Sequence, residues 1–291
     1  MYEAYYGLTT KPFSMLPDPY FLYWGRDHSI AYSMLEYGIL NQAGFTVVTG
    51  EIGCGKTTLL RQLLFYIDDR ITVGLISNTM MGQGTLLEWV LLSLNQPFDH
   101  VKYVALFRQL QEFLISEYRL GRHTVLIIDE AQNLDLNVLE ELRMLSNINA
   151  DGNQLLQVIL VGQPQLRTML QRPELIQFAQ RISSDFHLGP LPPDEVIQYI
   201  DHRLTLAGAT HALFSHGAAQ LIAEASGGIP RIINALCDAA LVYGMALRSQ
   251  EVTTQIVQEV LEDRRKFGFA TAQPQNVTWL GRPLQSGVKS D

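Results

Sequence analysis

The chain has 291 residues, of which 47% are hydrophobic and 17% charged, a composition that excludes extended disorder and allows a large core. With 21 Lys and Arg against 29 Asp and Glu, the formal net charge is −8. This acidic balance argues against a strongly basic nucleic-acid-binding module, because contacts with phosphates need clustered Lys and Arg. The length favours one large α/β domain or a domain with a smaller companion, and we expect the second.

Residues 1–27 are rich in aromatic residues and proline, which is typical of an ordered irregular arm packed on a domain. After this arm, short apolar segments alternate with segments of helical period. Strands are predicted at residues 45–49, 72–77, 124–129, 157–161 and 184–188, and helices at 28–41, 56–67, 86–94, 104–120 and 135–148. This alternation predicts a mainly parallel sheet with helices on both faces, spanning residues 28–190.

The pattern changes at a proline-rich turn over residues 189–193. Beyond the turn, only helical patterns follow, at residues 194–207, 215–225, 230–247 and 253–267. We therefore predict a small all-helical second domain at residues 191–267. Residues 268–291 are polar and show no period, which indicates a tail.

The strongest motif covers residues 50–57 and matches G-x-x-x-x-G-K-[ST], between a predicted strand and a predicted helix. Its backbone N–H groups would cradle phosphates, Lys56 would reach the β- and γ-phosphates, and the Thr57 hydroxyl would bind Mg²⁺. The alternative, a glycine-rich turn that happens to precede Lys-Thr, leaves the flanking strand and helix unexplained. The predicted nucleotide-binding residues are Gly50, Glu51, Ile52, Gly53, Cys54, Gly55, Lys56, Thr57 and Thr58.

A second motif is the apolar strand ending at Asp129 and Glu130. Parallel sheets place ligand sites at the carboxyl ends of their strands. Asp129 would then hold Mg²⁺, and Glu130 would polarise the water that attacks the γ-phosphate. The alternatives are two solvated acids after a strand, or a helicase DEAD-type box over residues 129–132, although the other helicase motifs are not evident.

Three weaker candidates depend on these two motifs. Gln163 follows the fourth strand, where a polar side chain could sense the γ-phosphate and orient water, unless it is an ordinary loop glutamine. Asn78 closes the second strand and could hold Glu130 in an inactive pose. Arg231 follows Gly-Gly-Ile-Pro at the start of a helix in the second domain, from which it could reach the phosphates.

Arg181 lies just before the fifth strand and could act in trans on the nucleotide of a neighbouring subunit. Arg167 and Arg172 are rivals for this role, and a plain surface arginine is the alternative. The seven histidines form no metal-ligand spacing, and no G-x-S-x-G motif is present, so zinc hydrolysis and serine catalysis have no support. We expect the Cys54 thiol to pack rather than to react.

Taken together, these residues resemble the AAA+ ATPases, with a phosphate loop, a D-E strand, a polar sensor, an arginine before the fifth strand and a helical lid. More narrowly, the chain is similar to the ExeA/GspA family of secretion ATPases, and within it to the ATPase encoded with exosortase (PEP-CTERM) and exopolysaccharide export loci. The narrower resemblance rests on residues 5–8, 11–13 and 17–19, the phosphate loop at 49–58, and residues 129–132, 161–164 and 228–234.

The resemblance implies a P-loop NTPase (AAA+) fold with ATP and Mg²⁺ as ligands. It also implies a homo-oligomer with nucleotides at its interfaces, an arm that packs near the adenine, and work for an envelope, secretion or polysaccharide-export system. Proteins of the full-length ExeA type carry a membrane span and a peptidoglycan-binding domain after the ATPase, and this sequence ends after a short tail. We therefore expect action through a membrane-protein partner.

The expected location is cytoplasmic, or peripheral at the inner membrane through such a partner. The N-terminus lacks the layout of a signal peptide, no apolar stretch reaches the roughly 18–20 residues that span a bilayer, and Cys54 and Cys237 suggest no disulfide framework. Two other functions stay open: an ATP-dependent regulator of DNA transposition, which the acidic charge disfavours, and a slowly hydrolysing nucleotide switch, which intact Lys56, Asp129 and Glu130 disfavour.

Overall fold

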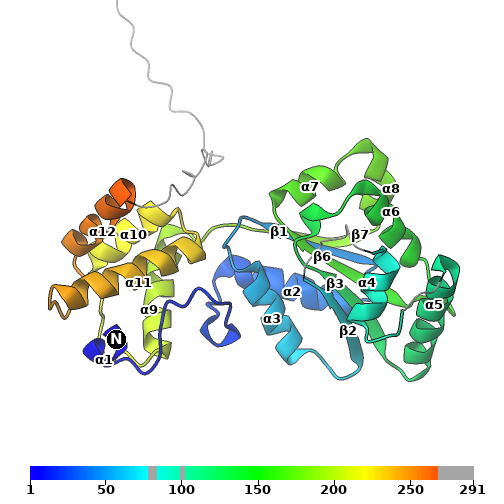
Figure 1. Ribbon diagram of the computed structural model, residues 1–291, viewed down its shortest axis with the longest axis horizontal. Coiled ribbons are helices and arrows are strands. Elements are labelled where there is room, and N and C mark those ends of the chain that lie inside the picture. Colours follow the sequence, from blue (N-terminus) through cyan, green and yellow to red (C-terminus); the bar gives the residue numbers. More distant parts are fainter. Residues whose placement is uncertain (78–83, 99–101, 268–291) are drawn as a thin grey trace, which may run out of the picture.

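The structure is a computed structural model that describes residues 1–77, 84–98 and 102–267. Figure 1 shows a sheet flanked by helices and, beside it, a group of helices formed by the later part of the chain. The candidate Asn78 and the predicted tail at residues 268–291 lie outside the described residues.

Within the described residues, five strands form one parallel sheet in the order β2-β3-β6-β1-β7. Their bounds are β1 Phe45–Gly50, β2 Ile71–Ile76, β3 His123–Ile128, β6 Leu156–Gly162 and β7 Ile182–Leu188. The predicted parallel sheet is confirmed. A two-residue hairpin that the sequence did not predict, β4 Asn149–Ala150 with β5 Asn153–Gln154, precedes β6.

Every residue of β1 and β6 is buried, because helices cover both faces of the sheet. Alternate residues point to opposite faces. Val47 and Leu126 pack into the core beneath α4 Leu86–Ser93, α5 Tyr103–Arg119, α6 Leu136–Leu145, α7 Pro164–Leu170 and α8 Ile176–Ala179. Val48 and Val125 pack into the opposite core beneath α2 Arg26–Leu40 and α3 Lys56–Tyr66.

Two helices on the first face, α7 and α8, were not predicted from the sequence, because both are short and follow each other between β6 and β7. The predicted helix at residues 135–148 is shorter in the structure. Asp135 caps its start by accepting from the Val138 N–H, and regular helix ends at Leu145.

The helices after the sheet are α9 Pro193–Leu206, α10 His216–Ser226, α11 Pro230–Ala246 and α12 Thr254–Phe267. The predicted helical part is confirmed. The N-terminal arm contains two short helical segments, α1 Tyr2–Tyr6 and η1 Pro19–Phe21, where the sequence predicted an irregular arm. Tyr2, Tyr6 and Phe13 share one apolar core with the four lid helices. Among the described residues, no helix has both the length and the hydropathy needed to cross a membrane.

Candidate nucleotide site

The strand order brings the predicted motifs to one edge of the sheet. The phosphate loop follows β1, Gln163 follows β6, and Asp129 and Glu130 follow β3. Because β6 lies between β1 and β3 and all three run in parallel, their carboxyl ends meet. This is the edge where parallel sheets bind ligands.

The phosphate loop depends on two glycines in the left-handed backbone region, Gly53 with φ 87° and Gly55 with φ 99°. A Cβ on Gly53 would also lie 2.6 Å from the Cβ of Arg231. The loop can therefore turn and contact α11 only with glycine at this position. Gly55 is followed directly by Lys56 at the start of α3, so the loop ends at a helix N-terminus, which favours anions.

Lys56 is 7% exposed, and its Nζ donates to the carbonyl oxygens of Gly50 at 2.8 Å and Glu51 at 2.9 Å. Burial lowers the pKa of its ammonium group, and the neighbouring acidic groups oppose this effect only in part. Additional negative charge at the loop would therefore stabilise the charged form of Lys56.

Asp129 lies opposite Thr57, whose hydroxyl donates to Oδ2 at 3.2 Å, and the Glu130 N–H donates to Oδ1 at 2.9 Å. Burial raises the pKa of the Asp129 carboxyl, and the carboxylate of Glu130 adds to the rise. A buried carboxylate next to a hydroxyl is a donor set that fits Mg²⁺. Within the described chain, no three His, Cys, Asp or Glu residues cluster as a metal site.

Glu130 has a left-handed backbone with φ 54°, which is uncommon for a residue other than glycine and typical of functional sites. Its Oε2 accepts from Nε2 of Gln132 at 2.6 Å and from Nε2 of Gln163 at 3.2 Å. The N–H of Gln163 donates to Oε1 of Gln132 at 2.9 Å. The structure therefore brings Glu130 and Gln163 together and adds Gln132.

The sequence predicts no separate role for Gln132, which lies within the possible helicase box at residues 129–132. The available signal was spacing. Gln132 lies in a single 3-10 turn, η2 Ala131–Asn133, two residues after Glu130, so its side chain can reach back to the carboxylate.

A cavity of about 310 Å³ opens over the phosphate loop, a volume at the lower end of the range for ligand pockets. It is lined by four parts of the chain: the loop and the start of α3, the tips of β3 and β6, the lid, and the arm. The arm residues are Ser14, Met15, Leu16, Pro17 and Asp18, and the lid residues are Tyr199, Arg203, Pro230, Arg231 and Asn234. Of these, the sequence predicted only Arg231 as a site residue.

Arg231 reaches the site because the start of α11 contacts the phosphate loop. Gly227 and Gly228 both have positive φ, Pro230 occupies the first turn of the helix, and the Arg231 N–H donates to the Gly53 carbonyl at 3.2 Å. The Arg231 side chain is exposed and lines the cavity. The structure thus places Arg231 beside the phosphate loop, and its contact with phosphates stays a prediction.

Arg203 and Tyr199 of α9, which line this cavity, connect the arm to the lid. Arg203 is 7% exposed; its Nε donates to the Pro12 carbonyl at 2.6 Å and its Nη1 to the Tyr199 hydroxyl at 2.8 Å. Its guanidinium carbon lies 4.8 Å from the centre of the Phe21 ring. The arm backbone is thus held by a buried cation of the lid.

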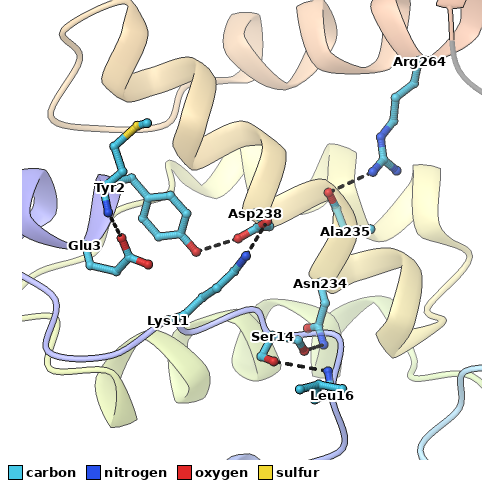
Figure 2. Close-up of polar contacts among 10 residues, drawn as sticks. Tyr2, Glu3, Lys11, Ser14, Leu16, Asn234, Ala235, Asp238 and Arg264 are labelled. Atoms are coloured by element: carbon cyan, nitrogen blue, oxygen red, sulfur yellow. Dashed lines mark hydrogen bonds and ion pairs between the residues drawn. The ribbon is translucent and has the colours of Figure 1, made fainter.

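Further contacts fix the arm on α11 (Figure 2). The Tyr2 hydroxyl and the Lys11 ammonium both donate to the Asp238 carboxylate, at 2.6 Å and 3.0 Å. Nearer the cavity, Nδ2 of Asn234 donates to the Ser14 carbonyl at 3.3 Å. The arm therefore forms part of the lid and supplies one wall of the cavity.

Arg181 lies away from this cavity, immediately before β7 and hence at the opposite end of the strand from Leu188, which pairs with Gly50. Its Nη1 donates to the Arg143 carbonyl at 3.2 Å and to the Ser146 hydroxyl at 3.0 Å. Its rivals Arg167 and Arg172 are exposed, and Arg167 lines a separate hollow beside β7. In the part of the structure described, no hydrogen bond or ion pair joins any of the three to the phosphate loop of its own chain.

The chain matches known proteins over this same region. Residues 39–170 match the protein family described as AAA domain. Over 253 residues, the chain is 39% identical to the general secretion pathway protein A of Aeromonas hydrophila, which covers 87% of this chain. The chain spans about half, 46%, of that relative's length.

Solved structures share the fold at low sequence identity. Cdc6p of Pyrobaculum aerophilum superposes with a TM-score of 0.64 at 16% identity, covering 85% of this chain and 71% of its own. The ORC2 protein of Aeropyrum pernix in ADPNP-ADP complexes gives 0.59 at 18% identity, covering 81% of this chain and 66% of its own. RuvB of Thermotoga maritima gives 0.54 at 19% identity, covering 83% of this chain and 70% of its own. With its phosphate loop, parallel sheet and helical lid, the chain is an ExeA/GspA-like AAA+ protein with the P-loop NTPase fold.

Proposed function

We propose that this chain binds ATP with Mg²⁺ in the 310 Å³ cavity and hydrolyses it. The observation that carries the proposal is the convergence of Lys56, Thr57 with Asp129, and Glu130 at the carboxyl ends of β1 and β3, two parallel strands with β6 between them. The ADPNP-ADP complexes of the ORC2 protein, which shares the fold, support a nucleotide as the ligand.

In this proposal each part of the cavity has one task. Lys56, the loop N–H groups and Arg231 bind and orient the phosphates, and the apolar arm residues Met15, Leu16 and Pro17 exclude water. Thr57 and Asp129 would hold Mg²⁺, which neutralises charge on the phosphate oxygens when bound. Glu130 accepts a proton from the attacking water, and Gln163 orients that water.

Two variants separate binding from turnover. Lys56→Ala removes the cation that meets the phosphates and is expected to abolish ATP binding, whereas Glu130→Gln keeps the shape of the site and is expected to bind ATP while losing about 100-fold or more in kcat. Binding is measured with a fluorescent ATP analogue and turnover by phosphate release. Hydrolysis by Glu130→Gln at the rate of the unsubstituted protein would contradict the role of Glu130, and absence of hydrolysis by the unsubstituted protein would favour a nucleotide switch.

We also propose that the chain works as a homo-oligomer for an envelope secretion or export system, acting through a membrane-protein partner. The similarity to general secretion pathway protein A over 87% of this chain supports the pathway. The test loads Glu130→Gln with ATP and asks whether it retains an envelope protein whose gene neighbours its own, with Lys56→Ala as the control that cannot bind ATP. Retention of duplex DNA in a filter-binding assay across salt concentrations, with no such envelope protein, would favour the transposition alternative.

A further inference from the structure

We propose that Gln132 is the positioning residue of Glu130: its side-chain amide fixes the direction of the Glu130 carboxylate and couples it to the start of α7. The inference rests on the proposed ATP hydrolysis, in which Glu130 is the proton acceptor. Glu130 and Gln163 line the cavity, and Gln132 contacts both.

The hydrogen bonds determine which way the Gln132 amide faces. The backbone N–H of Gln163 can only donate, so the Gln132 atom 2.9 Å from it must be the acceptor Oε1. The other amide atom is then Nε2, a donor, and it lies 2.6 Å from Oε2 of Glu130. The hydrogen bond from the Gln163 N–H thus orients the Gln132 amide so that its Nε2 donates to Glu130. A glutamine makes both hydrogen bonds, whereas a glutamate, a methionine or an alanine would not.

Gly162, the last residue of β6, makes room for this arrangement. A Cβ at Gly162 would lie 2.8 Å from Oε1 and 3.2 Å from the backbone nitrogen of Gln132. Because β6 pairs with both β1 and β3, the amide sits against the central strand of the site rather than on a loose loop. The glycine and the glutamine therefore act as one unit that presents a fixed donor to Glu130.

The Gln163 side chain adds a second donor to the same oxygen, Oε2, at 3.2 Å. Its backbone N–H meanwhile binds Oε1 of Gln132. A shift of the start of α7 would then move both donors together and turn the carboxylate. Loss of the Gln132 amide should displace the proton acceptor without removing it, and a misplacement of this kind costs about 10- to 100-fold in rate.

The experiment compares Gln132→Met, which keeps the length and removes both polar atoms, with Gln132→Glu, which keeps an oxygen for the Gln163 N–H but places a carboxylate against Glu130. Gln165→Glu, the same change on an exposed residue of α7, is the matched control. We expect both Gln132 variants to lower kcat about 10-fold or more while the Kd for ATP stays within about twofold. Thermal unfolding is measured in parallel. The control should match the unsubstituted protein in kcat, in the Kd for ATP and in its unfolding temperature.

A double variant distinguishes positioning from a general structural role. If Gln132 acts only through Glu130, then Gln132→Met adds no further loss of kcat in a Glu130→Gln background. Three results would each overturn the inference. They are a further loss of kcat in that double variant, an unchanged kcat in Gln132→Met, and a rise in the Kd for ATP as large as the fall in kcat. Gly162→Ala gives an independent readout, since it displaces the Gln132 amide without altering a polar group and should show the same fall in kcat at unchanged Kd.

The outcomes also separate this inference from the proposed function. One outcome rejects only the positioning role of Gln132 and leaves the proposed ATPase intact. In that outcome the unsubstituted protein hydrolyses ATP, Glu130→Gln does not, and both Gln132→Met and Gln132→Glu still do. Absence of turnover by the unsubstituted protein at every protein concentration rejects the ATPase and, with it, the positioning role.

Discussion

Cys54, inside the phosphate loop, has no exposed surface, and burial raises the pKa of its thiol to about 11. The thiolate is the reactive form, so the folded chain should react slowly with alkylating reagents. At pH 8 we expect modification of Cys54 by iodoacetamide to be about 100-fold slower than in the unfolded chain.

Peptide mapping by mass spectrometry separates Cys54 from Cys237, which is also buried. The same chain in guanidinium chloride provides the reference rate. Equal rates of Cys54 alkylation in the folded and unfolded chains would show that the loop opens readily and that the thiol is not packed.

His28 gives a pH-dependent prediction at the same scale. It is 4% exposed, and its Nε2 lies 3.0 Å from the Cys54 carbonyl oxygen. Burial lowers its pKa below the ordinary value of about 6.5. As the pH falls below about 6.5, the unfolded chain takes up a proton at this residue before the folded chain does, so the free energy of unfolding decreases.

We expect His28→Gln to lose less stability than the unsubstituted protein between pH 7 and pH 5. Urea unfolding at several pH values measures this difference. Burial also lowers the pKa of His187 and His202, but both are present in each protein, so the difference reports His28. Parallel pH curves for the two proteins would contradict the prediction.

At the scale of elements, the arm and the lid behave as one packed unit. Five aromatic or aliphatic residues of the arm, Tyr2, Tyr6, Leu8, Phe13 and Phe21, share the lid's core. Arg61 of α3 also contacts the arm, donating to the Pro17 carbonyl at 2.6 Å. The arm therefore bridges the lid to the helix that begins at the phosphate loop, next to the cavity.

Arg203 is the residue whose loss should release the arm. Arg203→Ala leaves the Pro12 carbonyl and the Tyr199 hydroxyl without their donor and removes a cation packed over Phe21. We expect a loss of about 2–3 kcal/mol in the free energy of unfolding, measured by urea titration. Limited proteolysis should cut within residues 1–22 in this variant before it cuts elsewhere.

Arg119→Ala on α5, an exposed arginine, is the matched control and should change the free energy of unfolding by less than about 0.5 kcal/mol. If Arg203→Ala resists protease as well as this control does, the arm is held by its apolar core alone.

At the scale of the whole molecule, we propose that Arg181 acts in trans, against the nucleotide of another subunit in the oligomer. Its distance from the phosphate loop along β7 is compatible with a role in trans. We expect Arg181→Ala to bind ATP normally and to lose hydrolysis, because the transition state would lack a cation from the neighbouring subunit. ATPase rates at increasing protein concentration measure this effect.

Mixing Arg181→Ala with Lys56→Ala should restore part of the activity, since each protein supplies what the other lacks at a shared interface. Arg167→Ala and Arg172→Ala test the rival residues in the same assay. Because Arg181 also binds the Arg143 carbonyl and the Ser146 hydroxyl, thermal unfolding must be unchanged before a loss is attributed to the interface. No rescue in any mixture would argue against an arginine that acts in trans.

The sequence by itself determined the motifs and most of the elements. Residues 50–57 and 125–130 could be recognised because their chemistry depends on local spacing, and the structure places Lys56, Thr57 and Asp129 together as that spacing predicts. The alternation of short apolar strands with helices predicted the parallel sheet, because a strand covered on both faces is apolar along most of its length.

Only the tertiary structure decided which residues surround these motifs. The order β3-β6-β1, which brings Gln163 to Glu130 and to Gln132, depends on pairings between strands that are far apart in the sequence. The same holds for Arg203 and Pro12, which are separated by 191 positions, and for the arm that completes the cavity. Local secondary-structure propensities do not predict such contacts, because the contacts form only when apolar surfaces that are distant in the sequence are buried together.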